Sequence, residues 1–155
     1  MSFLFDNSIS IFFATETWID EPNNATTAKI KSYGYKIIHH PRSSFDKTRG
    51  EGVAIIYNKC FNLTKFSTES FKSFESVSAK FKCEDGKHIC CSCVYRPGII
   101  SNVFFEEFDE YIEEIFVKFS NIVICGDFNI HLDNQNHHMD LSNSYKKVHM
   151  EMATG

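Results

Sequence analysis

NIVICGDFN, at residues 121–129, is the stretch that decides how this chain folds. Its run Ile122-Val123-Ile124 is typical of a strand buried on both faces. Gly126 is expected to end that strand, and an acid and an amide follow with one residue between them. Because residues two apart in an extended chain point to the same side, Asp127 and Asn129 are expected to face one pocket. A carboxylate that takes a metal or a proton, beside an amide that orients a substrate oxygen, suits phosphoester cleavage.

The rest of the chain alternates between strand and helix patterns. Apolar runs bounded by turn residues predict further strands. These cover residues 8–14, 35–39, 52–57, 61–66, 77–82 and 88–95. The last two are expected to form a hairpin at Asp85-Gly86, with positive φ at both turn residues. Thr26 or Thr27 is expected to cap a short helix that ends near Ser32.

One long helix is predicted over residues 102–119. Its apolar side chains recur every three or four residues, and acids cover the opposite face, which we interpret as solvated. The strands are of two kinds. Some are apolar on both faces, whereas residues 77–82 alternate with Ser78, Lys80 and Lys82 and are expected to be half exposed. Helices packed outside two stacked sheets produce this mixture, so we predict an α+β sandwich.

Composition limits the classes of protein. A chain of 155 residues is long enough for one domain with a real core, and 16 phenylalanines predict a core rich in aromatic rings. The net charge of −4 argues against broad non-specific binding of nucleic acid, although a nuclease needs only a local basic groove. No apolar run is long enough to cross a membrane, and the first residues do not predict a signal peptide. An intracellular location is therefore expected.

The cysteines predict free thiols rather than a disulfide framework. Cys90, Cys91 and Cys93 lie in one apolar strand and Cys125 lies in another, where buried thiols behave as small apolar groups. The sequence contains no C-x-x-C pair, so a zinc site is not expected.

Short polar segments end or open several of the predicted strands. They are TETW at residues 15–18, GEGVAI at 50–55, YRP at 95–97 and GDFN at 126–129. Together and in this order they resemble the endonuclease/exonuclease/phosphatase (DNase I-like) family. The greatest resemblance is to the endonuclease domain of non-LTR (LINE-type) retrotransposons, which also has an F-x-x-E-F helix where FFEEF stands at 104–108. Glu51 replaces the middle glycine of that group's G-G-G-V-A-I strand.

The resemblance covers about residues 13–133 and carries expectations about fold and activity. It implies a four-layer DNase I-like fold with two stacked, mainly antiparallel sheets flanked by helices, truncated at both ends. The partial domain would span residues 1–133, followed by a divergent or disordered tail over 134–155. The implied reaction is Mg²⁺- or Mn²⁺-dependent hydrolysis of a DNA phosphodiester. The implied partners are DNA and, in a full-length parent, a reverse transcriptase domain, and a functional protein would be nuclear although no compact Lys/Arg cluster is present.

Site roles follow from the resemblance position by position. Glu16 would bind the metal, and Tyr95 would orient a phosphate. Asp127 would align or deprotonate the attacking water, and Asn129 would position the nucleophile or the scissile phosphate. Arg96 either adds a phosphate contact or forms a structural ion pair.

Parts of the family pattern have no counterpart in this sequence. The Asn-bearing strand expected before Glu16 is missing, and no Ser-Asp-His follows Asn129. His131 comes too early to replace that histidine, and His137-His138 match no pattern and are expected to be solvated. We therefore expect this chain alone to be inactive, with uncovered sheet edges and poor solubility. The alternatives are a non-catalytic or binding remnant of a decayed retroelement reading frame, and an unrelated binding module.

Overall fold

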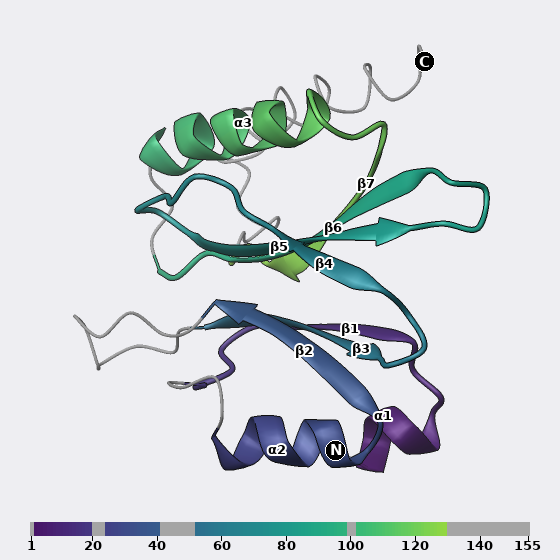
Figure 1. Ribbon diagram of the computed structural model, residues 1–155. Helices are drawn as coiled ribbons and strands as arrows, with labels where there is room; N and C mark the ends of the chain where they lie inside the picture. Colours follow the sequence, from purple (N-terminus) through teal and green to yellow (C-terminus); the bar gives the residue numbers. More distant parts are fainter. Residues whose placement is uncertain (1, 20–23, 41–51, 99–101, 130–155) are drawn as a thin grey trace.

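The structure is a computed structural model that describes residues 2–19, 24–40, 52–98 and 102–129, arranged in four layers (Figure 1). The helices are α1 (Ser2–Asp6), α2 (Ala25–Ser32) and α3 (Asn102–Phe116). The first sheet contains β1 (Ile11–Ala14), β3 (Val53–Asn58) and β2 (Tyr35–His40), in that order. The second sheet contains β4 (Leu63–Phe66), β5 (Glu75–Lys82), β6 (His88–Tyr95) and β7 (Asn121–Asp127), in that order.

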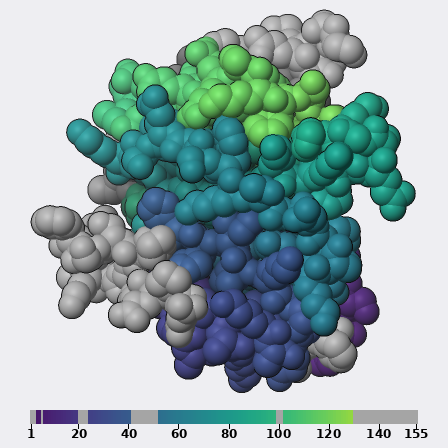
Figure 2. All heavy atoms as spheres, in the orientation of Figure 1, coloured from purple at the N-terminus to yellow at the C-terminus, as the bar shows by residue number. Residues whose placement is uncertain are grey.

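The two sheets lie face to face, with α1 and α2 outside the first and α3 outside the second (Figures 1 and 2). In the described part of the chain every strand pair is antiparallel except β6 with β7, which α3 connects in the parallel sense. The predicted α+β sandwich of two mainly antiparallel sheets with flanking helices is therefore confirmed.

Apolar side chains fill each space between layers, and β3 shows why. Its alternate residues point to opposite faces of the sheet. Val53, Ile55 and Tyr57 join the core between the two sheets, whereas Ala54 and Ile56 join the core against α1 and α2. Residues 53–57 are consequently all buried, as their unbroken apolar sequence predicts.

The third core lies between α3 and the second sheet and holds many of the phenylalanines. Phe74 meets Phe104 edge to face with ring centroids 5.9 Å apart, and Phe104 stacks on Phe108 at 5.4 Å. Phe66 and Phe119 close the far end of the same core at 5.1 Å. The predicted aromatic core is present, and it is built mainly from the apolar face of α3.

β7 differs from the prediction. Among the described residues it is the last strand of the second sheet, and with Val123 44 % exposed it is not buried on both faces. An apolar run such as Ile122-Val123-Ile124 predicts a strand, but it does not show whether neighbouring elements cover both faces of that strand. Gly126 does not end the strand either, since β7 continues through Asp127.

Other local predictions also need correction. Ser78 is buried and not exposed, because α3 covers that face and Tyr111 brings its hydroxyl 2.9 Å from the Ser78 hydroxyl. Asn24, and not a threonine, caps α2 by accepting a hydrogen bond from the Thr27 amide at 2.9 Å. In the β5–β6 hairpin only Gly86 has positive φ, 85°, because the turn is wider than two residues.

The helix boundaries also differ. α3 ends at Phe116, three residues earlier than expected, and α1 was not predicted because five residues carry too short a periodic pattern. No helix in the described residues is long and apolar enough to cross a membrane. The predicted tail at 134–155, His131, His137, His138 and Glu51 lie outside the described residues.

All six cysteines are free, as predicted. Burial raises the pKa of Cys93 to about 12, and burial together with neighbouring thiols raises the pKa of Cys91 to about 11. These thiols therefore stay protonated at neutral pH and act as core residues. Cys125, which was expected to be buried, and Cys83 are only partly buried, and Cys60 is exposed.

Candidate active site

Strand ends from both sheets meet at one end of the sandwich. Ala14 at the end of β1 pairs with Ala54 near the start of β3. In the second sheet Glu75, which opens β5, pairs with Tyr95 at the end of β6, and Tyr95 pairs with Asp127 at the end of β7. The segments that follow β1, β6 and β7 therefore converge, as the sequence predicted.

Tyr95 joins the two sheets at this end. Its hydroxyl donates a hydrogen bond of 2.6 Å to Oε1 of Glu16, just beyond β1. Burial, the hydrogen bond to Glu16, and the charges of Glu16, Asp127 and Glu75 raise the pKa of Tyr95 to about 12. The phenol therefore lies among three carboxylates, and it stays a protonated donor at neutral pH.

A second hydrogen bond links the two sheets, and this time the donor belongs to the first sheet and the acceptor to the second. The amide of Gly52 donates a hydrogen bond of 2.6 Å to Oε2 of Glu75, and the amide of Thr17 donates one of 3.1 Å to the Gly52 carbonyl. Gly52 has a φ of 96°, and a Cβ there would lie 2.7 Å from the Thr17 hydroxyl. Glycine is therefore required where the chain after β1 crosses the start of β3. Glu75 was not predicted as a site residue, because only its pairing with Tyr95 places it here.

Glycine is also required at position 126, for a steric reason. A Cβ at this position would collide with the carbonyl oxygen of Val94 on β6. Only glycine lets β7 approach β6 closely enough to place Asp127 beside Tyr95.

Asp127 and Asn129 are brought together by a turn and not by strand alternation, which corrects the sequence argument. Oδ1 of Asp127 accepts a hydrogen bond of 2.9 Å from the Asn129 amide, and Asn129 has a φ of 48°. Asn and Asp favour such turns because their side chains bind nearby backbone groups and tolerate left-handed φ. Asp127 is exposed, whereas Asn129 is partly buried.

Arg96 stabilises this turn through hydrogen bonds to its backbone. The residue is 1 % exposed; its Nε donates to the Phe128 carbonyl, and its Nη2 donates to the Asn129 carbonyl. In return Nδ2 of Asn129 donates a hydrogen bond of 2.7 Å to the Arg96 carbonyl. The guanidinium also lies 5.2 Å from the centre of the Phe104 ring. Burial lowers the pKa of Arg96, and the charge of Asp127 opposes that change.

The groups at this end fit a hard divalent cation. Among the described residues no group of three His, Cys, Asp or Glu side chains is arranged to hold a metal ion. The available donors are oxygens, chiefly the exposed carboxylate of Glu16, which Tyr95 holds through one oxygen. Mg²⁺ accepts such a site because it binds through one or two carboxylates and keeps several waters.

The fold resembles that of solved enzymes. ANGEL2, a 2′,3′-cyclic phosphatase solved with adenosine-2′,3′-vanadate, has a TM-score of 0.62 and 14 % identity over 90 % of this chain and 45 % of its own. TDP2 of D. rerio, solved with a single-strand DNA product, gives 0.60 and 13 % over 84 % and 52 %. TDP2 of Caenorhabditis elegans gives 0.56 and 16 % over 83 % and 40 %.

These proteins have the endonuclease/exonuclease/phosphatase, or DNase I-like, fold, which is therefore the fold of this chain. The chain spans about half the length of the solved structures it matches. No family model and no curated protein matches the sequence.

Proposed function

We propose that this end of the sandwich is part of a metal-dependent phosphodiesterase site, and that its substrate is DNA, as in non-LTR retrotransposon endonucleases. The observation that carries the proposal is the Tyr95 phenol, held as a donor among Glu16, Asp127 and Glu75 where both sheets end. The fold supports phosphoester chemistry, since its neighbours include a cyclic phosphatase and a protein bound to single-strand DNA. The sequence motifs supply the narrower assignment to retrotransposon endonucleases.

Each side chain has a role in this proposal. Tyr95 orients the Glu16 carboxylate and, because its pKa is about 12, keeps its proton; it would donate that proton's hydrogen bond to a phosphoryl oxygen only by giving up its bond to Glu16. Asp127 presents an exposed carboxylate that accepts the proton of the attacking water. Asn129 positions the nucleophile or the scissile phosphate. Glu16 would hold a divalent ion, whose charge would stabilise the phosphoryl oxygens.

We assign Arg96 to positioning and not to phosphate contact. Its side chain is 1 % exposed, its Nε and Nη2 already bind the Phe128 and Asn129 carbonyls, and its Nη1 is buried as well. A substrate phosphate would have to displace those bonds to reach it. The residue therefore acts through the turn that carries Asp127 and Asn129.

We expect this chain by itself to bind metal but to turn over slowly or not at all. The sequence after Asn129 contains no Ser-Asp-His, which supplies a phosphate-contacting histidine in the family it resembles. Catalytic groups that act as a unit do not give proportional activity when some are absent.

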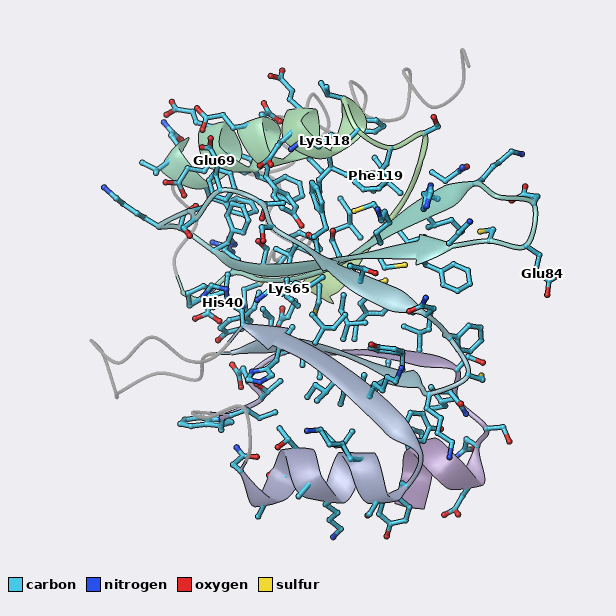
Figure 3. The ribbon with its side chains drawn as sticks, in the orientation of Figure 1. His40, Lys65, Glu69, Glu84, Lys118 and Phe119 are labelled. Atoms are coloured by element: carbon cyan, nitrogen blue, oxygen red, sulfur yellow. The ribbon has the colours of Figure 1, made fainter. Side chains whose placement is uncertain are left out.

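Metal binding tests the proposal directly. Trp18 is the only tryptophan and lies two residues from Glu16, so excitation of Trp18 should sensitise the luminescence of Tb³⁺ bound there. We expect Mg²⁺ to compete with Tb³⁺, Glu16→Gln to abolish the signal, and the control Glu84→Gln to leave it unchanged. Glu84 is exposed and lies at the opposite end of the sandwich (Figure 3). Equal signals from both variants would refute a metal site at Glu16.

Plasmid nicking tests the reaction. The purified chain is incubated with supercoiled plasmid and Mg²⁺ or Mn²⁺, beside Asp127→Ala. Nicking that disappears in Asp127→Ala would support the reaction and correct our expectation of slow turnover. Absence of both nicking and Glu16-dependent metal binding would favour the alternative of a non-catalytic remnant.

A further inference from the structure

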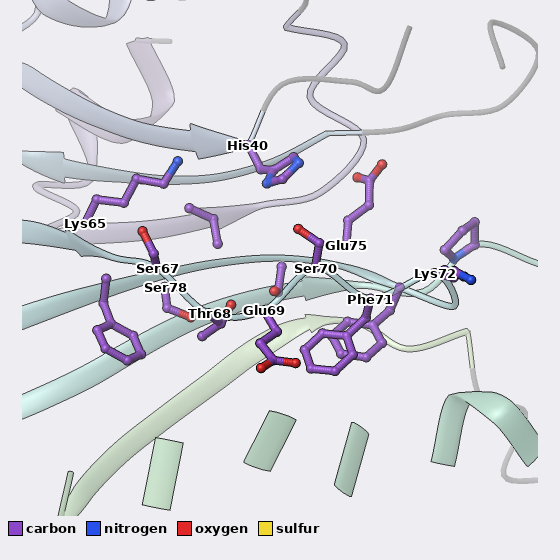
Figure 4. A pocket seen from close by; sticks show the side chains of 15 residues that line it. His40, Lys65, Ser67, Thr68, Glu69, Ser70, Phe71, Lys72, Glu75 and Ser78 are labelled. Carbon is purple, nitrogen blue, oxygen red and sulfur yellow. The ribbon is translucent and has the colours of Figure 1, made fainter. Parts of the chain in front are cut away.

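A cleft of about 500 Å³ lies beside the proposed active site. It is bounded by the end of β2 on one side and by the connection between β4 and β5 on the other (Figure 4). Glu75 lines the cleft and also lies among the groups around Tyr95. The cleft therefore opens at the same end of the sandwich as the reacting groups.

Basic side chains from both sheets meet in this cleft. Lys65 of β4 extends toward His40 at the end of β2 (Figure 4). Within the described ranges neither side chain has a hydrogen bond or an ion pair. Burial lowers the pKa of His40, and the charge of Lys65 lowers it further, so the two groups are close. His40 is therefore mainly neutral at neutral pH, and Lys65 supplies the positive charge that a bound anion would neutralise.

The acids that line the cleft do not neutralise this pair. Glu75 is engaged through one oxygen by the Gly52 amide. The Glu69 carboxylate points away from Lys65, toward the α3 side of the cleft (Figure 4). Glu69 thus lies away from Lys65 and one oxygen of Glu75 is already bonded, so Lys65 remains able to pair with a single anionic group.

The opposite wall supplies hydroxyl groups on a fixed loop. Ser67, Thr68 and Ser70 line the cleft from the β4–β5 connection. Glu107 of α3 accepts hydrogen bonds from the amides and hydroxyl at residues 72–73, the shortest being 2.6 Å from the Ser73 hydroxyl. Loops tied down in this way lose little entropy when a ligand binds.

We propose that this cleft binds a backbone phosphate of a nucleic-acid strand, a few nucleotides from the phosphate that the Glu16–Tyr95–Asp127 site would hydrolyse. This inference rests on the proposed function and adds a second phosphate-binding position on the same strand. The spacing is suitable, since Lys65 pairs with Ala79, four residues along β5 from Glu75. That separation is about 13 Å, and each strand of DNA carries a phosphate about every 3.4 Å of helix axis. Lys65 therefore reaches a phosphate a few nucleotides from the reacting one.

Binding without turnover tests the inference. The whole chain, in EDTA so that no hydrolysis occurs, is titrated into a fluorescent single-stranded oligonucleotide of ~12 nucleotides at several salt concentrations. Lys65→Ala should weaken binding about two- to fivefold, as for one partly exposed ion pair. The slope of log affinity against log salt should fall by about 0.7, the value for one phosphate contact on a single strand. His40→Ala should weaken binding in the same direction.

Lys82→Ala is the matched control. It removes the same charge from an exposed lysine at the far end of β5, where Lys82 pairs with His88. Binding and salt slope should be unchanged in this variant. Equal losses in Lys65→Ala and Lys82→Ala would show general attraction and refute the cleft, as would no loss in Lys65→Ala. Lys65-dependent binding together with absence of metal binding at Glu16 would uphold the cleft and refute the proposed hydrolase instead.

Discussion

Arg96→Lys is the substitution whose effect the structure defines best. Lysine keeps the positive charge but replaces a planar fork of donors by one ammonium group. Arg96 is 1 % exposed, and its guanidinium donates hydrogen bonds to two carbonyls, those of Phe128 and Asn129. One ammonium in this space cannot reproduce both bonds, so one buried carbonyl loses its partner.

The expected loss of stability is about 1–3 kcal/mol. One buried hydrogen bond from a charged donor contributes about 1.5–3 kcal/mol. Packing of the guanidinium on the Phe104 ring adds about 0.5–1 kcal/mol. Nη1 of Arg96 is buried without a hydrogen-bond partner in the described part of the chain, and removing that group returns about 1 kcal/mol.

Urea unfolding followed by circular dichroism measures this difference. Arg96→Lys should lower the midpoint with an unchanged slope, and Lys82→Arg, the reverse exchange at an exposed position, should change stability by less than about 0.5 kcal/mol. Asn129→Gly keeps the left-handed φ of 48° while removing the amide that binds the Arg96 carbonyl. The double variant should show a coupling energy of about 1 kcal/mol. A loss below about 0.5 kcal/mol in Arg96→Lys, or no coupling, would refute the positioning role.

Other groups give predictions that can be checked separately. Glu16→Gln should lower the pKa of Tyr95 from about 12 toward 10 in an ultraviolet titration of the phenol, because it removes a neighbouring charge. Since folding raises this pKa, the stability that it contributes is present below pH 10 and lost as the pH rises through about 12. Burial favours neutral Glu107, but hydrogen bonds from residues 72–73 outweigh it and lower its pKa, so its contribution is present above pH 4.5 and lost at lower pH. Glu107→Gln should therefore flatten the acid limb of the stability curve; an unchanged limb would contradict this assignment. Gly126→Ala should cost about 3 kcal/mol or more in a denaturant titration, and a loss under about 1 kcal/mol would show that β6 and β7 separate easily.

The fold could be predicted because its main patterns are local. β3 is apolar from Val53 to Tyr57, and a strand of that kind belongs in the middle of a covered sheet. The apolar side of residues 102–119 likewise identifies α3. β7 was misinterpreted because its burial depends on whether a strand lies on its other side, which periodicity does not report. Ser78 was misplaced for the same reason, since only the position of α3 makes that face an interior one.

The site was predictable only where a motif marks a strand end. Glu16, Tyr95 and Asp127 stand in such motifs, and the structure brings them together. Glu75 and Lys65 carry no local signal, because antiparallel pairing of distant segments determines their positions. The sequence also placed Asp127 and Asn129 together correctly, but a turn after β7, and not the strand alternation that was assumed, is the reason.

Residues of the GDFN motif at 126–129 have structural roles in this fold whether or not the protein is catalytic. Gly126 permits close approach to β6, Asp127 closes the turn, and Asn129 adopts a left-handed φ and binds Arg96. A protein that used this fold without hydrolysis would still need most of them, so the motif is weak evidence for activity. Glu16 is different. It is exposed and has a φ of 51°, a conformation that costs a non-glycine residue about 1–2 kcal/mol. Glutamine there would keep an acceptor for Tyr95 and the same backbone, and would lack only the charge. The comparison of Glu16→Gln with the unchanged chain therefore separates an enzyme site from a structural remnant better than any substitution within GDFN.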